Sequence, residues 1–393
     1  MRVKRVAWLA VMAVVMMGSA GAWAQKATPE VPLDNRTVQT GPLRVAIAGM
    51  VHGHVDGFLG AALKRRDIEI VGIAEPERTL FDAYAKKYGL DAKLYHADLE
   101  EMLTNTQPEA VLVYTNTFDH RKAVEICAKH TGGWIRPGVR KPLTVMMEKP
   151  LAVSAEDAHA IAKTATEAKM NVLVNYFTTW EPSRHGVYEV AHGGSIGDVW
   201  KIVAHDGHMG PKEIGVGPEF LGWLTDPKLN GGGALYDFGC YGADFVTWLM
   251  NGERPLTVTA VTLQIKPDVY PKVDDDATIV LTYPKAVGIV QGSWNWPFGR
   301  SDVQVYGKTG EVFTAGRDGM EVRKVGEAAL KKVDAPALVA PRDDELAYLR
   351  AVVREELKPE GQSSLEVNVV VAEVMDAARE SAKTGKTVKM GKK

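Results

Sequence analysis

Two kinds of hydrophobic pattern divide this chain. In its first part, short apolar runs alternate with segments in which apolar residues recur every three or four positions. Such runs are typical of strands buried on both faces, and the wider spacing is typical of helices with one buried face. The expected strands lie at 44–49, 68–75, 110–115 and 143–150, and the expected helices at 55–66, 78–89 and 120–130. The alternation predicts a doubly wound α/β domain built on a parallel sheet.

After Pro150 the pattern changes. One more amphipathic helix is expected, and then long β-rich segments follow that are too closely spaced for strand–helix–strand units. These segments lie at 198–208, 256–265, 276–296 and 301–315, and two final helices are expected at 342–357 and 364–385. We therefore predict a second, α+β domain with a large, mostly antiparallel, open sheet. The two domains are expected to occupy residues 43–152 and 153–393.

The first 24 residues have the features of a secretory signal peptide. A basic start precedes an apolar core that is short for a membrane span, and the sequence Ala-Trp-Ala at 22–24 is a typical cleavage signal. We expect an exported protein, periplasmic or secreted, with no membrane attachment after cleavage. An uncleaved anchor is the alternative, which the short core disfavours. Residues 25–42 are polar and contain scattered prolines, so they are interpreted as a leader.

Composition excludes some partners and cross-links. The formal net charge is −2 and charges of one sign do not cluster, which argues against a nucleic-acid partner. The two cysteines, Cys127 and Cys240, fall in different predicted domains and are expected to be free thiols.

The first strand leads into a degenerate glycine-rich turn. Gly49 stands where a dinucleotide-binding fingerprint has its first glycine, but Val51 and His54 occupy the second and third glycine positions. The second glycine normally lets the backbone approach the pyrophosphate. We interpret the first domain as a Rossmann-type dinucleotide-binding domain whose cofactor phosphates lie farther out, or are held partly by His52, Gly53 or His54.

An acidic residue at the end of the second strand bears on the choice of cofactor. Glu75 follows Gly49 at about the spacing at which a carboxylate binds the adenosine ribose hydroxyls. This favours NAD over NADP, although Arg78 leaves NADP open because a cation can neutralise a 2′-phosphate.

Two further segments carry candidate acid–base chemistry. Lys149 stands at the end of an expected strand, and Asp237, Tyr241 and Asp244 recur at a spacing that puts them on one helix face. An ammonium near a reacting hydroxyl lowers the cost of removing its proton. Because tyrosine titrates near pH 10, Tyr241 needs a cation such as Lys149 beside it to act as a base near neutrality.

Together these segments resemble the Gfo/Idh/MocA family of nicotinamide-dependent oxidoreductases, from about residue 43 to residue 390. The matching stretches are AVLVYTNTFDH, the tripeptide EKP at 148–150, PSRHGVYEVAHGGSIGDV, GGGALYDFGCYGADF and VYGKTGEV. The degenerate turn and Thr179-Trp180, where the family usually has Arg-Phe, are departures. The resemblance implies hydride transfer between NAD or NADP and a small carbohydrate.

The resemblance also implies roles for individual residues. Lys149 would bind the substrate hydroxyl and the nicotinamide side, Asp237 would position the sugar, and Tyr241 would carry the proton where most members have histidine. The implied cofactor contacts are Gly49, Val51, His52, Gly53, His54, Glu75, Thr115, Asn116, His120, Glu148 and Lys149, and the implied substrate contacts are Trp180, Trp223, Asp237 and Tyr241. By the same resemblance, the open sheet is expected to form a homodimer or homotetramer.

Three alternatives compete with this interpretation. The histidines at 52–54 and 205–208 suit a metal, but no cysteine or acidic residue stands at a supporting spacing, so no metal is predicted. Some relatives use a bound nicotinamide transiently and cleave a glycoside with no net redox change. In the third alternative the fold has lost its cofactor and binds carbohydrate only.

Overall fold

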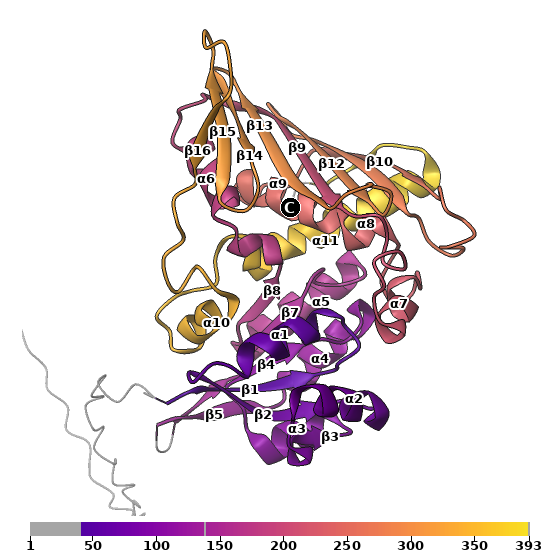
Figure 1. Ribbon diagram of the computed structural model, residues 1–393, viewed down its shortest axis with the longest axis vertical. Coiled ribbons are helices and arrows are strands. Elements are labelled where there is room, and N and C mark those ends of the chain that lie inside the picture. The colour runs from indigo at the N-terminus through magenta and orange to yellow at the C-terminus, as the bar shows by residue number, and fades with distance from the viewer. Residues whose placement is uncertain (1–40, 137–138, 392–393) are drawn as a thin grey trace, which may run out of the picture. The chain divides into compact units, whose positions relative to one another are not determined.

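The computed structural model describes residues 41–136 and 139–391 (Figure 1). The predicted signal peptide at 1–24 and most of the leader at 25–42 lie outside the described residues. Within those two ranges, the structure contains no helix that is both long and apolar enough to cross a membrane.

The first sheet is parallel throughout and has the strand order β3-β2-β1-β4-β7-β8. Its strands are β1 (Leu43–Ala48), β2 (Ile68–Ala74), β3 (Tyr95–His96), β4 (Ala110–Val113), β7 (Thr144–Glu148) and β8 (Val172–Asn175). The helices between them are α1 (His54–Ala62), α2 (Arg78–Tyr88), α3 (Leu99–Thr106), α4 (His120–Cys127) and α5 (Ala155–Ala168), with short 3₁₀ turns η1 (Ala92–Leu94) and η2 (Thr117–Asp119). The predicted doubly wound α/β domain is confirmed.

The first sheet continues past residue 152, where we expected the second domain to begin. Ser154 starts α5 as an N-cap, since its Oγ accepts a hydrogen bond from the backbone N–H of Asp157 at 3.1 Å. The helix then returns the chain to β8, which pairs in parallel with β7. An inserted two-stranded ribbon, β5 (Thr131–Arg136) with β6 (Val139–Pro142), leads into β7.

The second sheet has nine strands in the order β16-β15-β14-β13-β9-β12-β11-β10-β17. Its strands are β9 (Val199–Gly207), β10 (Thr257–Leu263), β11 (Asp276–Thr282), β12 (Val287–Ser293), β13 (Arg300–Gly307), β14 (Gly310–Thr314), β15 (Gly319–Lys324), β16 (Lys331–Asp334) and β17 (Val388–Lys389). Neighbours are antiparallel except β9 and β12, which run in parallel. The predicted large, mostly antiparallel sheet is confirmed.

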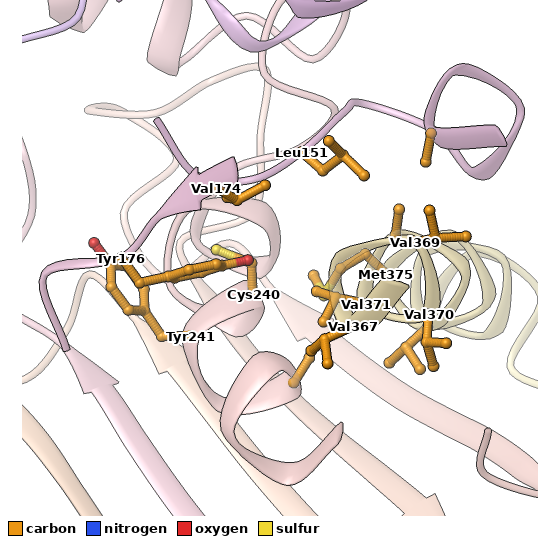
Figure 2. Packing of buried hydrophobic residues seen from close by; sticks show 14 of the residues in the cluster. Leu151, Val174, Tyr176, Cys240, Tyr241, Val367, Val369, Val370, Val371 and Met375 are labelled. Carbon is orange, nitrogen blue, oxygen red and sulfur yellow. The ribbon is translucent and has the colours of Figure 1, made fainter. Parts of the chain in front are cut away.

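Helices cover one face of this second sheet. They include α9 (Gly239–Leu249) and α11 (Leu365–Thr384), which Figure 1 shows lying along the sheet. Figure 2 shows the valines of α11 in one cluster with Leu151 and Val174 of the first domain and with Tyr176, Cys240 and Tyr241. Further helices are α6 (Pro182–His192), α7 (Pro218–Leu224), α8 (Ala234–Asp237) and α10 (Glu345–Val353), with turns η3 (Phe177–Trp180) and η4 (Gly361–Ser363).

The last part of the chain packs back onto the first domain. Leu346 and Leu349 of α10 belong to one hydrophobic cluster with Val45 and Ile47 of β1. Beyond α10, Arg354 forms a buried ion pair with Glu109, which precedes β4. The two sheets therefore share helices and core residues, and this places the ends of the first-domain strands beside the second sheet.

Candidate active site

A cleft of about 900 Å³ begins beside α2 and passes the N-terminus of α1. Tyr84 and Lys87 of α2 line one end, and Gly53 and His54 line the middle. The other end is lined by Lys149, Asp237 and Tyr241, together with Phe238 and His208. The structure thus brings together the three residues predicted to be catalytic, which come from two separate segments of the sequence.

Lys149 and Asp237 form a buried ion pair at this end of the cleft. They are 4% and 5% exposed, and Lys149 Nζ lies 2.5 Å from Asp237 Oδ1 and 2.8 Å from the Asp237 carbonyl oxygen. The other carboxylate oxygen accepts a hydrogen bond from Trp294 Nε1 at 2.9 Å. Burial is the largest single influence and opposes both charges, but the partner's charge, the hydrogen bonds and nearby charges together outweigh it, so the pKa of Lys149 is raised and that of Asp237 is lowered. Both groups therefore remain ionised.

Tyr241 lies directly beside this pair. Lys149 Nζ is 5.0 Å from the centroid of its ring, and the rings of Tyr176 and Phe177 contact it at 5.3 and 5.1 Å. Burial, reinforced by nearby acidic groups, raises the pKa of Tyr241 well above its usual value. In this arrangement the phenol keeps its proton and is a proton donor. The sequence instead suggested that Lys149 would help Tyr241 to act as a base. The structure differs because the Lys149 ammonium is bound by Asp237.

His208 is a cleft residue that sequence reasoning did not assign to catalysis. It follows Gly207, where the backbone has φ +145° and a Cβ would lie 1.9 Å from the Ser293 carbonyl oxygen. His208 Nδ1 accepts a hydrogen bond from the backbone N–H of Gly210 at 2.9 Å, and burial lowers the pKa of the ring. The neutral ring therefore carries its hydrogen on Nε2 and is a donor. A glycine-histidine pair at a strand end was the available signal.

The glycine-rich turn keeps its first glycine for a steric reason. Gly49 has φ +78°, and a Cβ there would lie 2.7 Å from Thr115 Cγ2. Glu75, predicted to contact the adenosine ribose, is 2% exposed. Its carboxylate accepts hydrogen bonds from the backbone N–H groups of Met50 at 2.7 Å and Glu77 at 2.9 Å. The structure therefore places Glu75 behind the turn and outside the lining of the cleft.

Helix α7 covers the next part of this turn. Trp223 Nε1 donates a hydrogen bond to the Val51 carbonyl oxygen at 3.1 Å. The His52 ring is buried between Phe220 and Trp223, with ring centroids 4.8 and 5.4 Å away. Trp223 therefore supports the turn, and it is not part of the cleft lining where we expected it to bind substrate.

Thr115, Asn116 and His120, predicted to line the nicotinamide half, make contacts within the fold. The Asn116 side chain caps η2 by accepting from the backbone N–H of Asp119 at 3.1 Å. His120 is fully buried, and its Nδ1 lies 3.1 Å from the Pro150 carbonyl oxygen. None of the three belongs to the cleft lining formed by residues 53–301.

Glu148 connects the turn to a second cavity. Its Oε2 lies 2.9 Å from His54 Nδ1, and its Oε1 accepts a hydrogen bond from Asn175 Nδ2 at 3.2 Å. Asn175 in turn accepts a hydrogen bond from Trp180 Nε1 at 2.9 Å. Trp180 lines a separate cavity of about 410 Å³ with Trp248, so it does not face the substrate end of the main cleft as predicted.

The cleft fits a nicotinamide dinucleotide along most of its length. Gly53 and His54 line it at the N-terminus of α1, where backbone N–H groups and the helix dipole favour an anion. Lys149 and Tyr241 at the far end supply the groups that a reacting hydroxyl needs. The buried Glu75 is the departure from this fit. Gly53 and His54 would hold the diphosphate, and Lys149 and Tyr241 would lie beside the reacting end of the cofactor.

Comparison with known proteins agrees with this assignment. Residues 43–176 match the family model described as an oxidoreductase family with an NAD-binding Rossmann fold. Residues 185–313 match the model described as the Gfo/Idh/MocA C-terminal domain. The two matches follow each other along the chain in the order of the two sheets.

Individual relatives are more distant. The trans-1,2-dihydrobenzene-1,2-diol dehydrogenase of Bos taurus is 25% identical over 250 residues, covering 64% of this chain and 66% of that protein. This chain thus spans less than two thirds of the length of the curated relatives it matches. Aldose-aldose oxidoreductase from Caulobacter crescentus, crystallised with glycerol, has a TM-score of 0.72 at 20% identity, over 89% of this chain and 100% of that one. An inositol dehydrogenase homologue from Azotobacter vinelandii, crystallised with NAD⁺, has a TM-score of 0.72 at 16% identity, over 89% and 98%.

Proposed function

Because the chain belongs to the Gfo/Idh/MocA family of NAD-binding oxidoreductases, we propose that it transfers a hydride between NAD and a hydroxyl-bearing carbon of a sugar or polyol. The observation that carries the proposal is the buried Lys149–Asp237 pair beside Tyr241 at one end of the cleft. Structural neighbours named as an aldose oxidoreductase and an inositol dehydrogenase homologue support the substrate class.

The protein's own groups account for the proton in this reaction. When bound, the nicotinamide donates or accepts the hydride. In the reducing direction, Tyr241 gives its proton to the carbonyl oxygen while Lys149 stabilises the negative charge that develops there. In the oxidising direction, the same oxygen returns the proton to Tyr241. His208, a neutral donor in the cleft wall, binds a second substrate oxygen.

The raised pKa of Tyr241 gives the two directions of the reaction different pH dependences. A phenol that keeps its proton at neutral pH is ready to act as an acid, so reduction proceeds without prior loss of a proton. Oxidation needs the phenolate, so its rate is expected to rise with pH up to the limit of the protein's stability.

We favour NAD over NADP as the cofactor. Arg78, the residue that left NADP open, stacks on the Tyr95 ring at 4.6 Å and pairs with Asp82 at 2.8 Å. Its charge is therefore already directed away from the cleft, where Tyr84 and Lys87 lie.

The decisive experiment compares Tyr241→Phe with the wild type. With NAD(H) and a panel of aldoses, ketoses and inositols, we expect turnover to fall by roughly 10²–10⁴-fold while NAD affinity stays unchanged. Tyr306→Phe, at a tyrosine of β13 that hydrogen-bonds Gln304, is the matched control and should leave both unchanged. A near-wild-type rate for Tyr241→Phe would reject the proposed acid. Failure of the wild type to bind either nucleotide would reject the function itself.

A redox-neutral reaction is the second candidate, favoured by a phenol that can protonate a leaving glycosidic oxygen. In this reaction the nicotinamide would supply a transient oxidation of the sugar, and Tyr241 would protonate the leaving glycosidic oxygen during elimination. Water would then add to the unsaturated sugar, and return of the hydride would leave no net redox change. Release of aglycone from a glycoside with no net change in nicotinamide absorbance would distinguish this reaction from net oxidation.

We also propose export and self-association. The signal peptide predicted at 1–24 supports a periplasmic or secreted location, which fractionation of the native host would test. Trp200, Val261 and Leu263 on the second sheet are exposed apolar residues, and they support a homodimer or homotetramer formed through that sheet. Light scattering of the purified protein would measure the assembly directly.

A further inference from the structure

Three metal-ligating side chains converge where the glycine-rich turn meets the end of β7. His52, His54 and Glu148 each place one ligand atom within 4.8 Å of the other two. His52 and Glu148 are buried, at 1% and 3% exposure, while the His54 side chain is 43% exposed. The site is therefore closed on two sides and open on one.

We propose that His52, His54 and Glu148 bind one divalent transition metal of the zinc class, with a further coordination position open to the cleft. Two imidazoles and one carboxylate form a donor set that suits zinc and the later transition metals. This inference goes beyond the proposed function and does not depend on it.

The ligand spacing needs only a small adjustment. Bonds of about 2.0–2.2 Å in tetrahedral geometry put ligand atoms about 3.4 Å apart, so the widest separation of 4.8 Å closes by at most about 1.4 Å. His54 Nδ1 and Glu148 Oε2 are already 2.9 Å apart. The separation that must close therefore involves His52, and a small shift of its ring or of the glycine-rich turn supplies the movement.

The surroundings hold the two buried ligands in place. Phe220 and Trp223 pack against the His52 ring at centroid distances of 4.8 and 5.4 Å. Asn175 donates a hydrogen bond to the carboxylate oxygen of Glu148 that does not face His54. Outer contacts of this kind orient ligands in metal sites and tune their affinity.

Neighbouring charge also permits a cation here. Lys149 is the residue next to Glu148, and its ammonium is paired with Asp237 at 2.5 Å, which reduces its repulsion of a metal ion. Of the three ligands, His54 is the one that lines the cleft. The open coordination position therefore lies on the cleft side, where it can take a water molecule or a substrate oxygen.

Sequence reasoning predicted no metal because no cysteine or acidic residue stands at a supporting spacing from the histidines. The fold supplies one from 94 positions away, since Glu148 ends β7 beside the turn that follows β1. The premise of that prediction therefore does not hold in the folded chain.

Cobalt binding tests the site without requiring activity. The full-length protein, stripped with a chelator, is titrated with Co²⁺ while the visible ligand-field bands are recorded, and Zn²⁺ affinity is measured by calorimetry. We expect one metal per chain with bands typical of a four- or five-coordinate N/O site. His52→Ala and Glu148→Gln should each weaken binding by roughly 100-fold or more.

The controls separate ligation from folding and from catalysis. His208→Gln alters a histidine of the same cleft that lies outside the cluster, and it should bind metal as the wild type does. His54→Ala, at the exposed ligand, keeps the test valid if a buried variant does not fold. Absence of stoichiometric binding, or equal binding by wild type and His54→Ala, would overturn the proposal. Metal binding without turnover would reject the proposed function alone.

Discussion

Removing the negative partner of the buried ion pair should destabilise the protein in a pH-dependent way. Asp237→Asn keeps the shape of the side chain and leaves the Lys149 ammonium hydrogen-bonded to the carbonyl oxygen of residue 237, at 2.8 Å, without a carboxylate beside it. Loss of one member of a buried pair typically costs about 3–5 kcal/mol, because the remaining charge is uncompensated.

The lysine can limit this cost by releasing its proton. With an ordinary pKa of 10.5, deprotonation costs about 5 kcal/mol at pH 7 and about 2 kcal/mol at pH 9. The free energy of unfolding should therefore fall by about 3–5 kcal/mol at pH 7 and by no more than about 2 kcal/mol at pH 9.

Urea denaturation of wild type and Asp237→Asn at both pH values measures this difference. Glu167→Gln breaks the exposed Lys163–Glu167 pair and should cost less than about 1 kcal/mol at either pH, which makes it the matched control. A loss for Asp237→Asn below about 1 kcal/mol at pH 7, or an equal loss at the two pH values, would refute the reasoning.

Three further predictions concern the supports of the site. Burial lowers the pKa of His120 to about 4, so the neutral ring stabilises the fold above pH 6.5. This contribution, about 3 kcal/mol, is lost as the pH falls from 6.5 to 4. His120→Gln should therefore flatten that part of a plot of unfolding free energy against pH, and an unchanged slope would contradict the prediction. Gly49→Ala should cost at least about 2 kcal/mol in urea, since the backbone is left-handed and Thr115 Cγ2 lies 2.7 Å from the new Cβ; a neutral variant would show that the turn can shift. Trp294→Phe removes a hydrogen-bond donor from Asp237 and should lower the free energy of unfolding by about 1.5–3 kcal/mol in urea. An unchanged free energy of unfolding would contradict this and would show that water replaces the indole N–H.

The parallel sheet and the cluster of Lys149, Asp237 and Tyr241 were predictable from sequence because both follow from local patterns. Apolar runs such as Thr144–Glu148 are buried along their whole length, which requires a sheet covered on both faces. Lys149 ends such a strand, and the carboxyl ends of parallel strands meet at one edge. Asp237 ends α8 and Tyr241 lies in α9, so the single helix face expected from the sequence is interrupted at Phe238, but the two residues are only four positions apart and their proximity was still encoded locally.

Contacts that depend on distant segments were not predictable in this way. Glu75 has the expected position along the chain, but the Met50 amide takes its carboxylate. Trp223 flanks a motif in sequence, yet α7 folds over the turn and uses its indole as a donor to Val51. The partnership of Glu148 with His54 joins segments that no spacing rule connects. In each case tertiary packing chose the partner.

The position of α10 makes completion of the first domain depend on the order of synthesis. Leu346 and Leu349 belong to one apolar cluster with Val45 and Ile47, so this cluster stays incomplete until nearly the whole chain has been made. The Glu109 carboxylate likewise waits for Arg354. A nascent chain that stops before α10 therefore exposes part of this apolar cluster and leaves Glu109 without its ion-pair partner, and exposed apolar surface makes incomplete chains prone to aggregate.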